Sequence, residues 1–104
     1  MGAGDPRAPR REGAEAIGTV VTIDHFGNLL TNLDAALVGE MAAPAVHVAG
    51  MVLPLGRTYG DAGPGEYLAL VNSFGVLEIA RCGMSAADGL GLQRGARVVV
   101  RGGA

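Results

Sequence analysis

Short apolar runs, broken at brief intervals by glycine, proline and asparagine, constrain the fold of this chain most strongly. The runs are rich in β-branched residues, which favour strands, and eighteen of the 104 residues are glycine, which suits turns and positive-φ positions. We expect strands over residues 17–23, 29–33, 66–71, 75–80 and 96–101, and one strand or a tight hairpin over 45–53. This pattern predicts an all-β, mainly antiparallel domain, a small β-barrel or sandwich with one or two short helices.

Two segments have the features of short helices. Residues 34–41 begin with Asp34, a suitable N-cap, and residues 84–90 are long enough for one or two helical turns. Residues 72–75, Asn-Ser-Phe-Gly, predict the turn of a hairpin. The three consecutive valines at 98–100 predict a closing strand that is buried on both faces.

Composition restricts the functional classes that the chain can belong to. The net charge is −2 and all eight cationic residues are arginine, which argues against general nucleic-acid binding. The single cysteine, Cys82, excludes an internal disulfide framework and fits a cytoplasmic location. No apolar run reaches the length of a membrane span. Residues 1–16 predict a disordered tail or linker remnant, which leaves 17–104 as one domain.

Residues 22–32 carry more chemical variety than a junction between a strand and a turn requires. Asp24 suits a ligand ammonium, Phe26 suits the face of a heteroaromatic base, and Asn28 suits the edge of adenine. Each also has a plainer explanation, respectively an Asx-turn, a core side chain and a positive-φ turn residue. Because the three lie within five residues, together they favour a binder of adenine and an ammonium group.

The turn at residues 72–75 is the second candidate binding segment. Ser73 offers a hydroxyl and neighbouring backbone N–H groups, which suit a small anion or a carboxylate. The alternative is an ordinary hairpin turn, which the spacing alone favours. No base lies close to Ser73 in the sequence, so nothing indicates that it is a nucleophile.

The remaining chemically notable residues indicate no catalytic or metal centre. Neither His25 nor His47 has the spacing of a metal ligand to another His or Cys. We interpret His25 as a surface residue that points away from Asp24 and Phe26 if the segment is extended, and Cys82 as a small packed residue. Tyr59 lies in a glycine-rich loop and is either a lid residue or a loop anchor.

Three motifs occur in a familiar order. Residues 23–32 have the sequence Ile-Asp-His-Phe-Gly-Asn-Leu-Leu-Thr-Asn, residues 72–80 Asn-Ser-Phe-Gly-Val-Leu-Glu-Ile-Ala, and residues 83–87 Gly-Met-Ser-Ala-Ala. Together they resemble the C-terminal domain of the S-adenosyl-L-methionine (SAM) hydroxide adenosyltransferases. These SAM hydrolases are related to the bacterial fluorinase and chlorinase, and the resemblance covers residues 17–101.

The resemblance implies roles for individual residues. Asp24 would hold the methionine ammonium, Phe26 would pack against adenine and Asn28 would contact the adenine edge. Ser73 and the backbone after it would grip the methionine carboxylate. The implied substrate-binding residues, with no catalytic residue or metal ligand among them, are Asp24, Phe26, Asn28, Ser73, Phe74, Cys82 and Gly83.

Two positions depart from the family pattern. Cys82 stands where relatives commonly carry Asn, which affects a polar contact near the adenine. Phe74 stands where the halogenating enzymes carry Arg, which favours the hydrolase branch.

The resemblance also implies that this chain is half of an active site. Family members have a larger N-terminal α/β domain, assemble as homotrimers, and bind the ligand between the N-terminal domain of one subunit and the C-terminal domain of its neighbour. We therefore expect a SAM- and adenosine-binding domain of a SAM hydrolase, with SAM as substrate and no cofactor. Alone it would be inactive, because the N-terminal domain supplies the groups associated with water. The alternative is a non-catalytic adenosine-binding or trimerisation β module.

Overall fold

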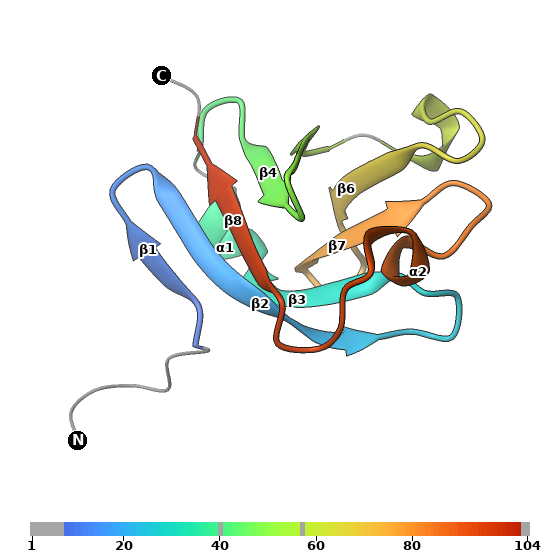
Figure 1. The fold of residues 1–104 in the computed structure, drawn as a ribbon. Coiled ribbons are helices and arrows are strands. Elements are labelled where there is room, and N and C mark those ends of the chain that lie inside the picture. The colour runs from blue at the N-terminus through green and yellow to red at the C-terminus, as the bar shows by residue number, and fades with distance from the viewer. Residues whose placement is uncertain (1–7, 40, 57, 103–104) are drawn as a thin grey trace.

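The computed structural model describes residues 8–39, 41–56 and 58–102. Its strands are β1 (Arg10–Glu12), β2 (Glu15–Ile23), β3 (Leu29–Asp34), β4 (Ala45–Val48), β5 (Met51–Pro54), β6 (Tyr67–Val71), β7 (Val76–Arg81) and β8 (Arg97–Arg101). Its helices are α1 (Ala35–Val38), α2 (Ala86–Leu90) and the 3₁₀ turn η1 (Tyr59–Asp61). The strands form one sheet in the order β5-β4-β8-β2-β3-β7-β6, with β1 paired to β2 (Figure 1).

Strand β2 holds the two halves of the sheet together. Its first half pairs with β8 and its second half with β3, and the register shifts between Val20 and Thr22. Such a bulge bends a strand, and the long curved ribbon of β2 is visible in Figure 1. At the far edges β5 and β6 approach each other, and Leu55 forms a parallel bridge to Ala69. The sheet is therefore mainly antiparallel and barrel-like, and it is nearly closed.

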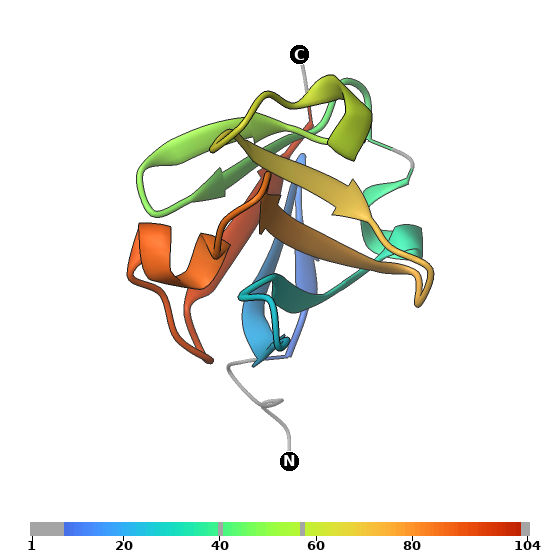
Figure 2. The same ribbon diagram turned by 90° about the vertical axis from the view of Figure 1, so that its right-hand side faces the viewer.

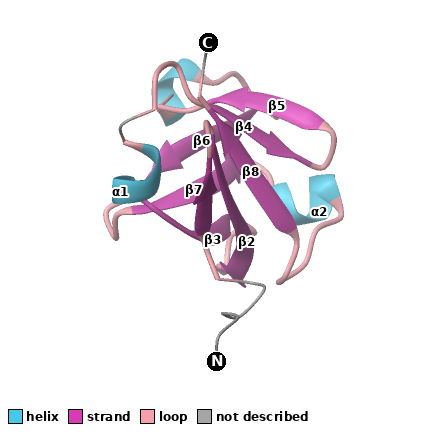
Figure 3. Cartoon of the chain, turned by 90° about the vertical axis from the view of Figure 1, so that its left-hand side faces the viewer, coloured by secondary structure: helices cyan, strands magenta, loops and turns pink. Residues whose placement is uncertain are grey.

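The core lies inside this curved sheet and is aliphatic. Leu29, Leu33, Leu77 and Ile79 are fully buried, and Val98 packs against them from the other half of the sheet. The short helices α1 and α2 lie at the rim and outside the strands (Figure 3). The strands thus supply most of the apolar burial that stabilises the fold, and Val38 of α1 and Ala86 of α2 add to the same core.

The predicted fold class is confirmed. The hairpin alternative for residues 45–53 is the one observed, with Ala49 and Gly50 at φ values of 50° and 78°, as a tight two-residue turn requires. Strands β6 and β7 form the predicted hairpin and run side by side in Figure 2. Asp34 is the N-cap of α1 and accepts a hydrogen bond from the Leu37 N–H at 3.0 Å. Among the described residues, no helix is long and apolar enough to cross a membrane.

Two predictions differ from the structure. The sequence predicts a tail in the region of Arg10–Glu12, but these residues form a strand. They pair antiparallel with β2, with Arg10 opposite Ile17. The valines of β8 are not buried on both faces. Val98 and Val100 are buried, but Val99 is only half-buried, because alternate residues of a barrel strand face outward. Residues 1–7 of the predicted tail lie outside the described residues.

Thr31 provides a direct test of the packing between β3 and β7. It is buried, its hydroxyl donates to the Leu77 carbonyl at 2.9 Å, and it accepts from the Leu33 N–H at 3.1 Å. Thr31→Val keeps the shape but leaves both backbone groups without this partner. We expect a loss of about 2 kcal/mol in the free energy of unfolding, measured in denaturant.

The matched control is Thr22→Val, at an exposed position of β2. This change should alter the free energy of unfolding by about 0.5 kcal/mol or less. Equal stability of the two variants would contradict a structural role for the Thr31 hydroxyl.

Candidate functional site

The turn between β2 and β3 is closed by Asp24. One oxygen of its carboxylate accepts from the backbone N–H groups of Phe26 and Asn28, each at 2.9 Å, and the other accepts from the Asn28 side-chain amide at 3.0 Å. The Asp24 backbone N–H also donates to the Asn28 carbonyl at 3.0 Å. A carboxylate offers about four acceptor positions, so the turn itself uses most of them. The Asx-turn that was the plainer explanation of Asp24 is therefore present.

These hydrogen bonds set the ionisation of Asp24. Burial raises the pKa of its carboxyl, but the hydrogen bonds from the backbone and side chain of Asn28 and from the Phe26 backbone outweigh burial and hold the pKa below its ordinary value. The ionised carboxylate is a better acceptor than the neutral acid. The turn is consequently built around a negative charge.

Gly27 allows this turn to lie directly against the segment before α2. Its φ is +84°, and an added Cβ would lie 2.0 Å from Ser85 Oγ and 2.9 Å from Ser85 Cα. Its carbonyl accepts from the Ala87 N–H at 2.9 Å. Ser85 is in turn the N-cap of α2 and accepts from the Asp88 N–H at 3.1 Å. A contact this close to backbone atoms requires glycine.

An open hollow of about 520 Å³ lies where these segments meet. Its lining residues come from the β2–β3 turn, from η1, and from the last residue of β7 and the segment after it: Phe26, Asn28, Tyr59, Arg81, Gly83, Met84 and Ser85. Phe26 is 75% exposed, so it is not the core side chain of the plainer explanation. The structure thus brings Phe26, Asn28 and Gly83 together from two motifs that lie far apart in the sequence.

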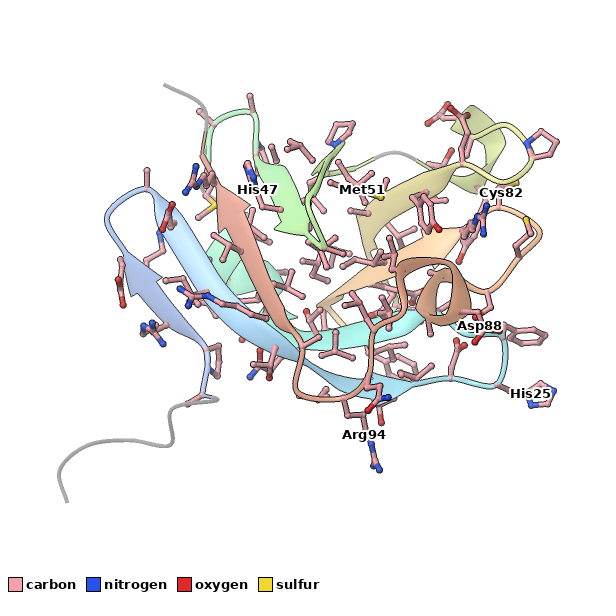
Figure 4. All side chains as sticks on the ribbon, viewed as in Figure 1. His25, His47, Met51, Cys82, Asp88 and Arg94 are labelled. Carbon is pink, nitrogen blue, oxygen red and sulfur yellow. The ribbon has the colours of Figure 1, made fainter. Side chains whose placement is uncertain are left out.

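The geometry of Asn28 and His25 differs from simple expectation. The positive φ in the turn belongs to Gly27 and not to Asn28, whose side-chain amide is oriented by its hydrogen bond to Asp24. His25 is exposed and extends outward (Figure 4). It contacts Phe26, with ring centroids 5.4 Å apart in an edge-to-face arrangement. The predicted surface position is confirmed. The condition that the segment is extended is not met, because the chain turns here and brings the two rings into contact.

The other predicted binding residues lie outside the hollow. Ser73 and Phe74 form the exposed turn before β7, whereas the hollow begins at Arg81, where β7 ends. Phe74 is 83% exposed. Cys82 is a partly buried free cysteine that is not among the lining residues, and its backbone pairs with Gly65 and Glu66. Figure 4 shows Cys82 in the loop that follows β7.

Four lining residues were absent from the predicted set: Tyr59, Arg81, Met84 and Ser85. Arg81 is held by two contacts: its Nε donates to the Gly65 carbonyl at 2.9 Å, and its guanidinium lies 4.9 Å from the ring centroid of Tyr67. Arg81 could have been predicted from the sequence, because it lies between the motifs at residues 72–80 and 83–87. The glycine-rich loop marked Tyr59 as a lid residue or a loop anchor, but the sequence does not show which site it reaches, because η1 meets the hollow only through the sheet topology.

The polar surroundings of Tyr59 distinguish it from a solvated loop residue. Its hydroxyl donates to Glu78 Oε2 at 3.2 Å. Burial and the nearby Glu78 carboxylate raise the pKa of the Tyr59 phenol, so it is the neutral hydroxyl that is present at neutral pH. Among the described residues, no group of three or more His, Cys, Asp or Glu side chains is arranged to hold a metal ion.

The chain is similar to known proteins over most of its length. The sequence model of the SAM hydroxide adenosyltransferase C-terminal domain family matches residues 18–99. An (R)-S-adenosyl-L-methionine hydrolase of Thermus thermophilus is 42% identical over 84 residues, covering 81% of this chain and 31% of that protein. A protein of the same name from Salinispora tropica is 36% identical over 91 residues, covering 81% of this chain and 32% of that protein.

Solved structures show the same fold. An uncharacterized conserved protein from Thermotoga maritima superposes with a TM-score of 0.74 at 28% identity, covering 91% of this chain and 39% of that one. A conserved hypothetical protein from Thermus thermophilus superposes with a TM-score of 0.68 at 36% identity, covering 94% of this chain and 37% of that one. The chain spans about a third of the length of the curated relatives that it matches.

Gly27→Ala tests the contact between the turn and α2. We expect a loss of about 3 kcal/mol in the free energy of unfolding, because about 1–2 kcal/mol of left-handed strain adds to a clash with Ser85. The control is Gly50→Ala, at a φ of +78° with no atom within 4 Å of an added Cβ. The control should show the strain alone. Equal losses in denaturant titrations of the two variants would show that the contact with Ser85 contributes nothing.

Asp24→Asn tests the charge at the centre of the turn. A lowered folded-state pKa stabilises the fold above the ordinary carboxyl value of 3.8, and this stabilisation is lost as the pH falls through the folded-state value. At neutral pH we expect Asp24→Asn to lower the free energy of unfolding by about 1 kcal/mol. The difference from the parent should shrink as the pH is lowered below 3.8. Asp88→Asn, at an exposed position of α2, is the control, and a difference independent of pH would contradict the role of the charge.

Proposed function

This chain belongs to the SAM hydroxide adenosyltransferase C-terminal domain family, and we propose that it forms the adenosine-binding part of a SAM hydrolase. The observation that carries the proposal is the hollow at the rim of the barrel. There an exposed aromatic ring, Phe26, and an oriented amide, Asn28, meet the backbone of Gly83. A ring face and a side-chain amide are what a purine requires.

In the proposed complex, Asp24, Phe26 and Asn28 of the β2–β3 turn and Gly83 after β7 have distinct roles. Phe26 packs against the adenine ring and Asn28 contacts its edge, while Gly83 lets the backbone approach the base. Asp24 is ionised, and its charge attracts the methionine ammonium at the acceptor position that the turn does not use. Its pKa is too low for a general base at neutral pH.

The residues proposed to contact the methionine carboxylate lie away from the hollow. We propose that Ser73 and the backbone at Phe74 contact the carboxylate. They lie at the opposite end of β7 from the hollow, about 17 Å along a strand of this length. We also propose that Cys82 acts through its backbone, since its side chain does not line the hollow.

The proposed reaction of the complete enzyme is hydrolysis of SAM. The oxygen of water attacks the ribose C5′, the C5′–S bond breaks, and its electron pair remains on sulfur. Adenosine, methionine and one proton are released. The sulfonium is already a good leaving group, so no cofactor is required, and the residues of this chain bind and orient the substrate.

The missing part of the site belongs to a partner in this proposal. Since the chain spans about a third of its curated relatives, we propose that an N-terminal α/β domain supplies the groups that handle water and the ribose. The ligand would lie between that domain of one subunit and this domain of the next, in a cytoplasmic homotrimer. Phe26, Phe74 and Met84 are all exposed apolar side chains, which suits burial against another chain.

The alternative function is a non-catalytic β module that binds adenosine or forms trimers. The same exposed apolar residues favour it, because they fit an interface with or without a ligand. Ligand binding by the isolated chain separates the proposed function from a module that only forms trimers.

Calorimetry of the 104-residue chain with adenosine and with SAM tests the proposal. We expect binding by the parent, loss of binding in Asn28→Ala, and unchanged affinity in His47→Ala, a β4 residue outside the hollow. Phe26→Ala should weaken binding by about tenfold without lowering the unfolding midpoint, because Phe26 is exposed. Conversion of SAM by the chain alone should not be detectable.

Three outcomes would contradict the proposal. Parent affinity in both Asn28→Ala and Phe26→Ala would place the ligand elsewhere. Failure of the parent to bind either compound would favour the structural module. Turnover of SAM by the isolated chain would show that no other domain is needed.

A further inference from the structure

A chain of side-chain hydrogen bonds connects Tyr59 to the turn that carries Ser73. Glu78, in the middle of β7, is 9% exposed and accepts at both carboxylate oxygens. Oε2 accepts from the Tyr59 hydroxyl at 3.2 Å, and Oε1 accepts from the side-chain amide of Asn72 at 3.0 Å. A buried carboxylate is costly unless it is hydrogen-bonded, and here two donors from different loops meet that requirement.

The Asn72 end of this chain is fixed by the turn. Asn72 Oδ1 accepts from the Phe74 N–H at 2.9 Å and from the Val76 N–H at 3.3 Å. The amide nitrogen must therefore face Glu78. A displacement of the Glu78 carboxylate would therefore act on the Asn72 side chain, which also holds the backbone N–H groups of Phe74 and Val76.

At the Tyr59 end of this hydrogen-bond chain, the backbone is held by its own cap and the side chain is partly exposed. The backbone of η1 is capped, because Asp61 accepts from the backbone N–H of Thr58 at 3.0 Å and from its hydroxyl at 3.1 Å. The Tyr59 side chain is 49% exposed, and it lines the hollow that also contains Phe26 and Asn28. The hydrogen bond from its hydroxyl to Glu78 connects the ring to β7.

We propose that Glu78 is a positioning residue that holds Tyr59 at the wall of the adenosine hollow and couples that wall, through Asn72, to the turn carrying Ser73. The proposal rests on the proposed function for its ligand, but the coupling is a property of the chain alone. It connects the two ends of β7, which the family motifs mark as separate contact points and which do not meet in one cavity.

The chemistry of Glu78 makes the proposal specific. A carboxylate accepts from both donors without reorientation. Glutamine can also satisfy both, since its oxygen accepts from Asn72 and its amide donates to the Tyr59 hydroxyl, which can reverse from donor to acceptor. Leucine satisfies neither and leaves the Tyr59 ring to sample other rotamers. Binding would then have to order that ring, at a cost that corresponds to about a threefold to tenfold loss of affinity.

The first experiment needs no ligand. Tyr59→Phe removes only the hydroxyl, and nuclear magnetic resonance should show shifts at the Asn72 side-chain amide and the Phe74 backbone amide. Tyr67→Phe is the matched control, since it removes the other tyrosine hydroxyl of the chain and should leave both signals in place. Unchanged Asn72 and Phe74 signals in Tyr59→Phe would overturn the coupling.

The second experiment measures adenosine affinity by calorimetry. Glu78→Gln should bind like the parent, whereas Glu78→Leu and Tyr59→Phe should each bind about threefold to tenfold more weakly. The double variant Glu78→Leu/Tyr59→Phe should bind no more weakly than either single variant, because both remove the same contact. Parent affinity in Glu78→Leu, or additive losses in the double variant, would overturn the positioning role.

The two experiments separate this proposal from the proposed function. If the parent does not bind adenosine, the proposed function fails, and the Tyr59→Phe resonance shifts still decide whether the coupling exists. If the parent binds and Glu78→Leu binds equally well, the proposed function stands and the positioning role fails. If Glu78→Leu does not fold, Glu78→Gln, Tyr59→Phe and Tyr67→Phe still provide both measurements.

Discussion

The close approach of Gly27 to Ser85 is the contact on which the candidate site depends. It places the β2–β3 turn against the N-cap of α2, with backbone separations that leave no room for a Cβ. Phe26 and Asn28 lie on one side of this contact, and Gly83 and Met84 on the other. This contact brings the β2–β3 turn and the segment before α2, which are more than fifty residues apart in the sequence, to the same hollow. A positive φ and a missing side chain together make the hollow possible.

The barrel separates the residues that stabilise the fold from those that form the candidate site. Its aliphatic residues are buried along the strands, and the chemically distinctive residues lie at strand ends and in loops. Strand β7 contains both kinds of residue. Leu77 and Ile79 are buried in the core, whereas Glu78 accepts hydrogen bonds from loop side chains and Arg81 lines the hollow. Loops held by a rigid scaffold are a common place for binding residues.

Two carboxylates near the site are used to build loops. Asp24 accepts three hydrogen bonds within its own turn, and Glu78 joins Tyr59 to Asn72. Groups held in this way orient the side chains and backbone around them. In the proposed function these two carboxylates position residues of the candidate site, and the chemistry is assigned to a domain outside the described residues.

The sequence by itself determined the fold class, the hairpin of β6 and β7, the Asp34 cap and the motif at Asp24, because strand propensity, turn chemistry and capping act over a few neighbouring residues. For residues 45–53 it left one strand and a tight hairpin as alternatives, and the structure shows the hairpin. The sequence also predicted that Phe26, Asn28 and Gly83 belong to one site. Only the tertiary structure decided that Tyr59 and Arg81 join them, that Ser73 lies at the other end of β7, and that Val99 faces outward. These facts depend on which strands become neighbours and how the sheet curves, and no local pattern records either one.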